Sequence, residues 1–216
     1  EYREYKQAHG MLDFDDLLAR TLELFEADDE IRQQVAGRCR HVLVDEYQDT
    51  NALQAELVKQ FASVHGNVTV VGDDAQSIYR FRGADYRNIF RFPDEYPGAE
   101  VLKLEQNYRS TQPILDFANH VIDRAERSYD KTLFSETEEG DLPALVPAAD
   151  GEMESRFVAQ MIMRLREDGV PLSDIAVLFR SGHNAYDLEV ELNRRNIPFV
   201  KYGGLKLNEA AHIKDV

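Results

Sequence analysis

The sequence contains one cysteine, no tryptophan and no long hydrophobic run, and these absences exclude several classes of protein. A single thiol, Cys39, excludes a disulfide framework and argues against a zinc cluster. No apolar run approaches the roughly 18 residues that a membrane-spanning helix needs, which rules out a membrane protein. The chain opens on Glu1 rather than methionine, and no signal peptide is visible. We therefore expect a protein of the reducing cytoplasm and, from the missing start, a fragment of something longer.

Basic side chains are also scarce: 25 Lys and Arg stand against 40 Asp and Glu, for a formal net charge of −15. Taken alone, this charge argues against nucleic-acid binding, because contacts to phosphate need Lys and Arg. The charge is segregated, however. Residues 126–154 are dominated by acidic side chains, which we interpret as a solvated surface loop, whereas residues 79–92 carry four arginines and one aspartate. A local basic patch therefore survives inside an acidic chain.

The 216 residues, of which 43% are hydrophobic and 30% charged, suit one large globular domain or two small ones. Their apolar spacing alternates between helical and strand-like patterns. Helices are expected at 13–26 (capped by Asp13), 51–63, 85–92 (ended by Pro93), 111–127, 152–168 and 184–196. Strands are expected at 41–44 and 68–71, both buried, and at 101–104, 175–180 and 199–202, with a possible short one at 144–146. This alternation predicts an α/β fold with a mainly parallel sheet, and a change in composition near 103–110 allows two such units.

Polar side chains follow three of these strands, at the carboxyl ends where open parallel sheets bind ligands. The first strand runs directly into Asp45 and Glu46. One carboxylate can hold a hydrated Mg²⁺ ion, and its neighbour can orient or deprotonate an attacking water. The plain alternative is an acidic strand-to-helix turn in which the aspartate caps the helix.

The second strand ends in a polar turn that contains Gln76, a neutral group able to touch a phosphate or position a water. Tyr79, Phe81 and Arg82 follow, and aromatic rings between arginines suit stacking on single-stranded bases. An ordinary turn and a pair of core aromatics are the alternatives here.

The third strand end carries Tyr108 and Arg109. An arginine in this place can stabilise a phosphoryl group in transfer, and the tyrosine can stack on a purine. The alternative is a capped helix start with Arg109 in a surface ion pair.

Taken together and in this order, the three strand ends resemble a known family. DEYQDTN at 45–51, GDDAQSIYRFRGA at 72–84 and LEQNYRS at 104–110 resemble motifs II, III and IV of the UvrD/Rep/PcrA branch of superfamily 1 DNA helicases. LDFDDLL at 12–18 and the terminal YGGLKLNEAAHIKDV extend the resemblance over nearly the whole chain. The resemblance implies an ATP-dependent helicase that moves 3′ to 5′ along single-stranded DNA by opening and closing two RecA-like domains around ATP.

The resemblance also implies roles for residues of motifs II and III toward the nucleotide. Asp45 matches the aspartate associated with Mg²⁺, and Glu46 matches the catalytic glutamate. Gln76 matches the glutamine that senses the γ-phosphate. Gln48 lies in motif II and is expected to couple the nucleotide to DNA.

The remaining roles implied by the resemblance concern the base, the γ-phosphate and DNA. Tyr108 matches a residue that packs on adenine, and Arg109 matches an arginine that reaches the γ-phosphate from the second motor domain. Tyr79 and Phe81 match aromatic positions that contact single-stranded DNA, with Arg82 beside them. Phe81 stands where many relatives have tryptophan, so a smaller face is expected to stack.

The family's phosphate-binding loop is absent, because no GxxxxGK[ST] occurs in these 216 residues. Motifs I, Ia, V and VI are absent as well. We therefore expect the central slice of a helicase, with residues 1–103 from domain 1A and residues 104–216 from domain 2A, ending near the 2B insertion. Its partners would be single-stranded and duplex DNA and the remaining helicase domains, namely the rest of 1A and 2A with 1B and 2B. Alone, the chain is expected to be inactive as an ATP hydrolase.

Three other functions compete with a helicase acting in DNA repair or replication. One is a non-catalytic RecA-like interaction module, and another is the helicase part of a helicase–nuclease. The third is an unrelated Mg²⁺-dependent hydrolase that uses Asp45, Glu46, Asp73 and Asp74 as metal ligands. This last reading explains the carboxylates but not the aromatic and arginine segments.

Overall fold

The computed structural model describes residues 1–137 and 139–203, and the described residues fall into two compact units that divide between Pro143 and Ala144. Most of the terminal YGGLKLNEAAHIKDV segment, including the expected 2B insertion point, lies outside the described residues. None of the helices in the described part of the chain is long and apolar enough to cross a membrane.

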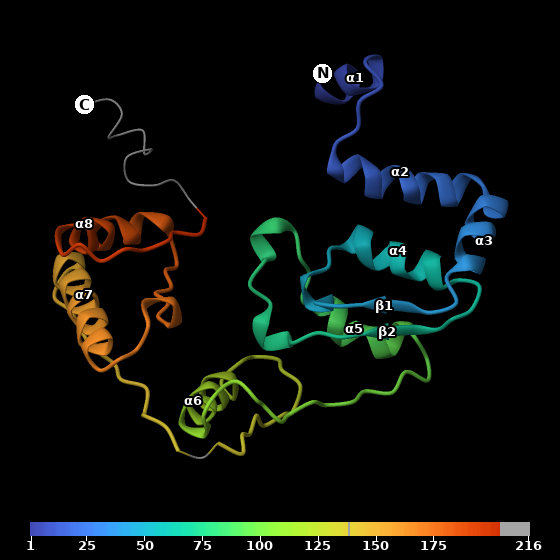
Figure 1. Cartoon of the computed structure of the whole chain (residues 1–216). Helices are drawn as coiled ribbons and strands as arrows, with labels where there is room; N and C mark the ends of the chain where they lie inside the picture. The colour runs from blue at the N-terminus through green and yellow to red at the C-terminus, as the bar shows by residue number, and fades with distance from the viewer. Residues whose placement is uncertain (138, 204–216) are drawn as a thin grey trace. The chain divides into compact units, whose positions relative to one another are not determined.

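The first unit is built around two parallel strands, β1 (Val42–Val44) and β2 (Val68–Val70), joined by helix α4 (Ala52–Ala62) (Figure 1). Val42 pairs with Val68 and Val44 with Val70, which confirms both predicted strands and their parallel order. The valines of the two strands pack against the helices, but Leu43 between them is 76% exposed. The expectation of fully buried strands is therefore wrong: one face of this pair is covered and the other is open.

Three helices precede β1: α1 (Tyr2–Ala8), α2 (Phe14–Ala27) and α3 (Asp29–Arg38). Helix α2 confirms the one predicted at 13–26, and Asp13 caps it in a reciprocal pair with Asp16, each side chain accepting from the other's backbone N–H. Leu22 and Phe25 of α2 pack on Leu57 of α4 to form a small core. Helices α1 and α3 lie outside the helices that the sequence predicts.

Helix α5 (Arg87–Glu95) continues through Pro93, so the prediction that this proline ends the helix is wrong. Proline lacks the N–H that would bond to the carbonyl of Ile89, four residues earlier. The hydroxyl of Tyr129 donates to that carbonyl at 2.9 Å, and its ring stacks on Phe90 with centroids 5.0 Å apart. A distant residue thus supplies the hydrogen bond that the proline removes.

The segment 101–104 is not a strand, contrary to prediction. Its Leu102 and Leu104 side chains are 76% and 87% exposed, and no described residue offers these four a strand to pair with. Pairing begins only at Gln106, in an isolated parallel bridge to Phe134. Helix α6 (Gln112–Ile122) follows, shorter than predicted, with Pro113 in its first turn.

The second unit is a pair of helices, α7 (Gly151–Glu167) and α8 (Tyr186–Arg194), which confirm the two predicted there. Ala159 and Ile162 of α7 pack against Leu188 and Leu192 of α8, with Ile197 completing the core. The predicted strands at 144–146, 175–180 and 199–202 are wrong, because none of these segments has a ladder partner among the described residues. The described residues form helices and one small parallel sheet, which is consistent with the α/β class.

Candidate functional site

The turn after β1 places Asp45 and Glu46 at the carboxyl end of the strand, as the sequence predicts. Glu46 adopts a left-handed backbone conformation (φ 51°, ψ 43°), which side-chain-bearing residues adopt at an energetic cost and which is often found at functional sites. Its N–H donates to the Asp45 carboxylate at 2.9 Å. Both side chains are exposed, so this turn, which we call the acid turn (Asp45–Asp49), presents two adjacent carboxylates to solvent.

Gln48 is the fully buried centre of the acid turn, with 0% of its surface exposed. Its amide nitrogen donates to Glu46 Oε2 at 2.7 Å, and its amide oxygen accepts the backbone N–H of Asp73 at 3.0 Å. The glutamine thereby fixes the Glu46 carboxylate and joins the turn after β1 to the turn after β2. This orienting contact is what the structure assigns to Gln48, and its expected coupling to DNA stays a prediction.

Gly72 makes this close approach of the two turns possible. A Cβ atom at position 72 would lie 2.5 Å from the Gln48 amide oxygen and 2.9 Å from Cδ1 of Ile89. Any larger side chain would push Gln48 out of place, so the glycine belongs to the site although it carries no functional group.

The turn after β2 holds Gln76 through Asp73. Gln76 Nε2 donates to Asp73 Oδ2 at 2.8 Å, and the Asp73 side chain also caps the turn at the N–H of Ala75. Lys131 donates to both Asp73 and Asp74 at 2.5 Å. Burial raises the pKa of Asp73, but the hydrogen bonds from Lys131 and Gln76 outweigh it and hold that pKa below its ordinary value. Sequence reasoning missed Lys131, whose only signal was being one of two basic residues in the acidic tract.

The aromatic segment that follows is exposed rather than packed into the core. The rings of Tyr79 and Phe81 lie 6.0 Å apart, and Arg82 covers both, at 5.0 and 5.4 Å from their centroids. Phe81 is 76% exposed, so the alternative of a core aromatic is wrong for this residue. The three side chains that the sequence singled out for DNA form one cluster.

The end of this aromatic segment is tied to the end of the acid turn through Thr50. Its carbonyl accepts the N–H of Asp85 and the side-chain amide of Asn88, both at 3.0 Å. The Thr50 hydroxyl in turn donates to the Tyr47 carbonyl at 2.6 Å. These hydrogen bonds join the end of the acid turn to the residues that follow the aromatic cluster.

The arginine turn (Glu105–Ser110) is fixed in its backbone but open in its side chains. Asn107 Oδ1 accepts the N–H groups of Arg109 and Ser110, at 2.9 and 2.7 Å. Tyr108 is 87% exposed, and its hydroxyl donates to Gln106. Among residues 1–137 and 139–203 no acidic side chain forms an ion pair with Arg109, so the surface-ion-pair alternative is wrong there. No hydrogen bond in this part joins Arg109 to the acid turn.

The donor set fits a largely hydrated magnesium ion rather than a dedicated metal cage. The described residues contain no cluster of three or more His, Cys, Asp or Glu side chains arranged to hold a metal. Mg²⁺ is usually coordinated by one or two carboxylates and keeps several of its water ligands, and the exposed Asp45 could provide one such carboxylate. Asp73 and Asp74 are already occupied by Lys131, which counts against the hydrolase that would use them as ligands.

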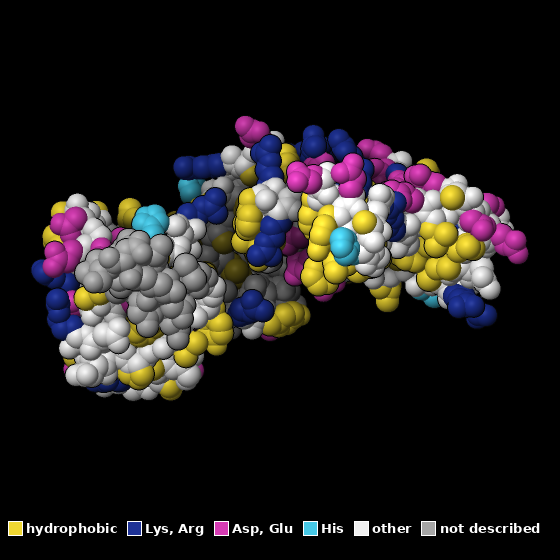
Figure 2. Space-filling model, turned by 90° about the horizontal axis from the view of Figure 1, so that it is seen from above, with side chains coloured by type: hydrophobic (Ala, Val, Ile, Leu, Met, Phe, Trp, Pro, Cys, Tyr) yellow, Lys and Arg dark blue, Asp and Glu magenta, His cyan; other side chains and the backbone are white. Residues whose placement is uncertain are grey.

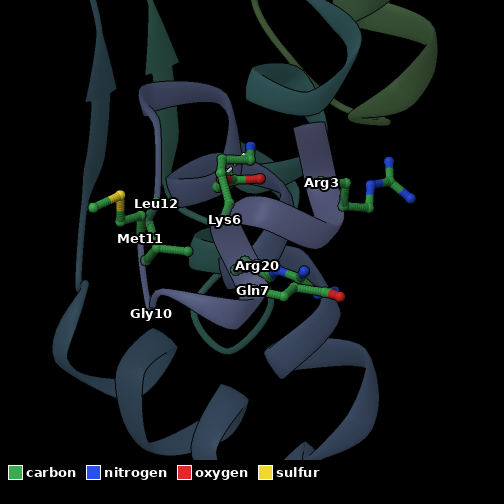
Figure 3. Close-up of a pocket in the computed structure, with 8 residues that line it drawn as sticks. Arg3, Lys6, Gln7, Gly10, Met11, Leu12 and Arg20 are labelled. Carbon is green, nitrogen blue, oxygen red and sulfur yellow. Dashed lines mark hydrogen bonds and ion pairs between the residues drawn. The ribbon is translucent and has the colours of Figure 1, made fainter. Parts of the chain in front are cut away.

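A separate hollow of about 280 Å³ lies where α1 meets α2 and contains none of the predicted site residues (Figure 3). Lys6 lines it and is neutralised by Asp13 and Asp16, at 2.7 and 2.5 Å. Arg3 points away from Lys6 in this view. On the face seen in Figure 2, acidic and basic side chains lie mixed with exposed hydrophobic ones. Neither observation offers a rival to the strand-end turns as the functional site.

Comparison with known proteins gives matches along the whole chain. The UvrD/REP helicase N-terminal domain matches residues 1–97, and the UvrD-like helicase C-terminal domain matches residues 102–216. DNA helicase II of Haemophilus influenzae is 42% identical over 99% of the chain, which covers 29% of that protein. ATP-dependent DNA helicase UvrD1 of Mycobacterium tuberculosis is 41% identical, and PcrA of Staphylococcus epidermidis 39%, each over the full chain and about 30% of the relative. The chain thus spans about a third of the length of the curated relatives it matches.

Proposed function

Because this chain belongs to the UvrD-like helicase family, we propose that it is the central part of an ATP-dependent DNA helicase. The intact protein would couple ATP hydrolysis to 3′-to-5′ translocation on single-stranded DNA and unwind duplexes in repair or replication. Residues 1–103 would belong to RecA-like domain 1A and residues 104–216 to domain 2A. The two family matches support this division, since one ends at residue 97 and the other begins at 102.

The observation that carries the proposal is the buried Gln48 amide between Glu46 and Asp73. It holds a carboxylate at one strand end at a fixed distance from the Gln76 turn at the next. Glu46 would take a proton from the attacking water, because one of its oxygens is fixed by Gln48 and the residue is exposed to solvent. Gln76 would contact the γ-phosphate from the neighbouring turn.

The ion and the second lobe complete the proposed nucleotide site. Asp45 would hold Mg²⁺ through its exposed carboxylate, and the bound ion would neutralise negative charge on the β- and γ-phosphates. Arg109 would reach the γ-phosphate and Tyr108 would pack on the adenine. Their exposed side chains on a fixed backbone support this role, since they are open to a ligand.

The aromatic cluster would bind the single strand. Tyr79 and Phe81 offer exposed rings for stacking, and Arg82 adds a positive charge within reach of the backbone phosphates. A shift of this cluster on DNA binding would be transmitted to the acid turn through the hydrogen bonds of Thr50. DNA binding could thereby change the rate of ATP hydrolysis.

Strand unwinding by the intact protein tests the proposal. We expect ATP hydrolysis stimulated by single-stranded DNA, and unwinding of a duplex with a 3′ tail but not of one with only a 5′ tail. No stimulation and no unwinding would instead favour a non-catalytic module, while DNA cleavage would reveal a helicase–nuclease. We expect the protein in the cytoplasm, and the 216-residue chain alone, without a phosphate-binding loop, to show no ATP turnover.

A further inference from the structure

Lys131 is a largely buried lysine that neutralises two carboxylates at once. Its ammonium lies 2.5 Å from an oxygen of Asp73 and 2.5 Å from an oxygen of Asp74, and its side chain is 15% exposed. Asp74 is 3% exposed and also accepts the N–H of Tyr129 at 3.0 Å. Removing the ammonium would leave two adjacent carboxylates without a counter-charge, a costly arrangement when one of them is buried.

The carboxylate that Lys131 holds is the one that holds Gln76. Asp73 receives Lys131 on Oδ1 and the Gln76 amide on Oδ2. A shift of this carboxylate would move the Gln76 amide with it. Among the described residues no hydrogen bond joins Lys131 to Gln76 directly, and the two side chains are linked through Asp73.

The chain segment around Lys131 is also bonded to the arginine turn. The N–H groups of Thr132 and Phe134 donate to the side chain and the carbonyl of Glu105, at 2.6 and 3.1 Å. The Phe134 carbonyl accepts the N–H of Asn107 at 2.7 Å. Asn107 is the residue whose side chain fixes the backbone of Arg109. Residues 131–134 therefore join the Gln76 turn to the arginine turn.

We propose that Lys131 is a positioning residue, which sets the Gln76 turn against the arginine turn so that both can act on one nucleotide. This inference rests on the proposed function, since it assumes that Gln76 and Arg109 serve the same γ-phosphate. Lys131 does not touch the nucleotide. It controls the rate of hydrolysis by keeping the Asp73 carboxylate, and with it the Gln76 amide, in the productive place.

The test is a double-mutant cycle in the intact protein with Lys131→Met and Gln76→Ala. Lys131→Met should lower kcat for DNA-stimulated ATP hydrolysis about tenfold or more, the effect of losing a charged hydrogen bond, and leave KM for ATP within about twofold. In the Gln76→Ala background the same change should have little further effect, because Lys131 acts through Gln76. Lys59→Met is the matched control, since Lys59 is a lysine of the same unit that pairs with Glu56 and Glu95, outside both turns and the 131–134 segment, and it should leave kcat unchanged.

Additive losses in the double variant, or a kcat of Lys131→Met equal to that of the unaltered protein, would overturn the proposal. If Lys131→Met fails to fold, Lys131→Gln keeps most of the volume and an uncharged amide donor, and the same non-additivity with Gln76→Ala is required. An unaltered protein without DNA-stimulated hydrolysis would refute the proposed function instead, so the two failures can be told apart.

Discussion

The acid turn and the arginine turn differ in which part of the chain is held in place, the side chains or the backbone. In the acid turn the side chains are fixed: Gln48 is wholly buried and holds Glu46 at 2.7 Å. In the arginine turn the backbone is fixed by Asn107, while Tyr108 stands 87% exposed and Arg109 has no acidic partner within the described residues. One turn has its chemical group in place, and the other holds its groups ready for a ligand.

The difference suggests a division of labour within the proposed helicase. A general base must be oriented before the water arrives, because a misplaced base loses most of its effect. An arginine and a tyrosine that engage the nucleotide from another lobe gain from being free until the lobes close. Variants that alter the acid turn or the residues bonded to it test this difference.

The largest effect is expected for Glu46→Gln in the intact protein. The amide cannot accept the proton of the attacking water, so the rate of ATP hydrolysis should fall by about 10²–10⁴ while ATP binding is retained. Turnover and nucleotide binding are measured side by side. Glu100→Gln, an exposed glutamate elsewhere in the unit, serves as the control, and a near-normal rate for Glu46→Gln would show that this carboxylate is not the base.

Gly72→Ala should displace the buried Gln48 side chain and so disturb the acid turn. The new methyl group would meet the Gln48 amide oxygen at 2.5 Å, so we expect the free energy of unfolding to fall by about 1–3 kcal/mol. Urea unfolding measures this loss. Gly37→Ala in helix α3 is the control, because nothing lies within 4 Å of its added atom, and it should be neutral or stabilising. Equal stability of the two variants would mean that the turns after β1 and β2 can move apart without loss of stability.

Features that depend on nearby residues were predictable from the sequence, whereas contacts between distant residues were not. The acid pair, the two valine-rich strands and the Asp13 cap depend on neighbours a few residues away, and all three were predictable. The hydrogen bond from Tyr129 to the Ile89 carbonyl, which replaces the one lost at Pro93, and the binding of Asp73 by Lys131 join residues 40 and 58 positions apart. Strands were wrongly predicted at 101–104 and 175–180, because apolar spacing shows that a segment could pair, not that a partner is beside it.

Phe81→Ala should weaken binding of single-stranded DNA by about 1–3 kcal/mol, the usual worth of one stacked base. Fluorescence anisotropy with a labelled oligonucleotide measures the affinity at fixed salt. Phe117→Ala removes a similarly exposed ring from helix α6 and should change little. Equal affinities for the two variants would assign Phe81 a role other than stacking.

The smallest effect concerns acid stability at the Lys131 contact. Because the pKa of Asp73 is lowered in the folded protein, its contribution is complete above the unfolded pKa of about 4 and is lost as the pH falls through the folded value. Lys131→Met removes a main cause of that lowering, so stability should decline less steeply with acid. Urea unfolding between about pH 5 and pH 2 measures the slope. An unchanged slope would show that the Asp73–Lys131 pair does not contribute to stability.

The central claim is that the acid turn and the arginine turn act on one nucleotide, and the structure of the intact protein with Mg²⁺ and a non-hydrolysable ATP analogue tests it most directly. We expect the Glu46 carboxylate to face the water in line with the γ-phosphate, and the Arg109 guanidinium to contact that same phosphate. A nucleotide bound with Arg109 directed elsewhere, or held by residues outside both turns, would contradict the account.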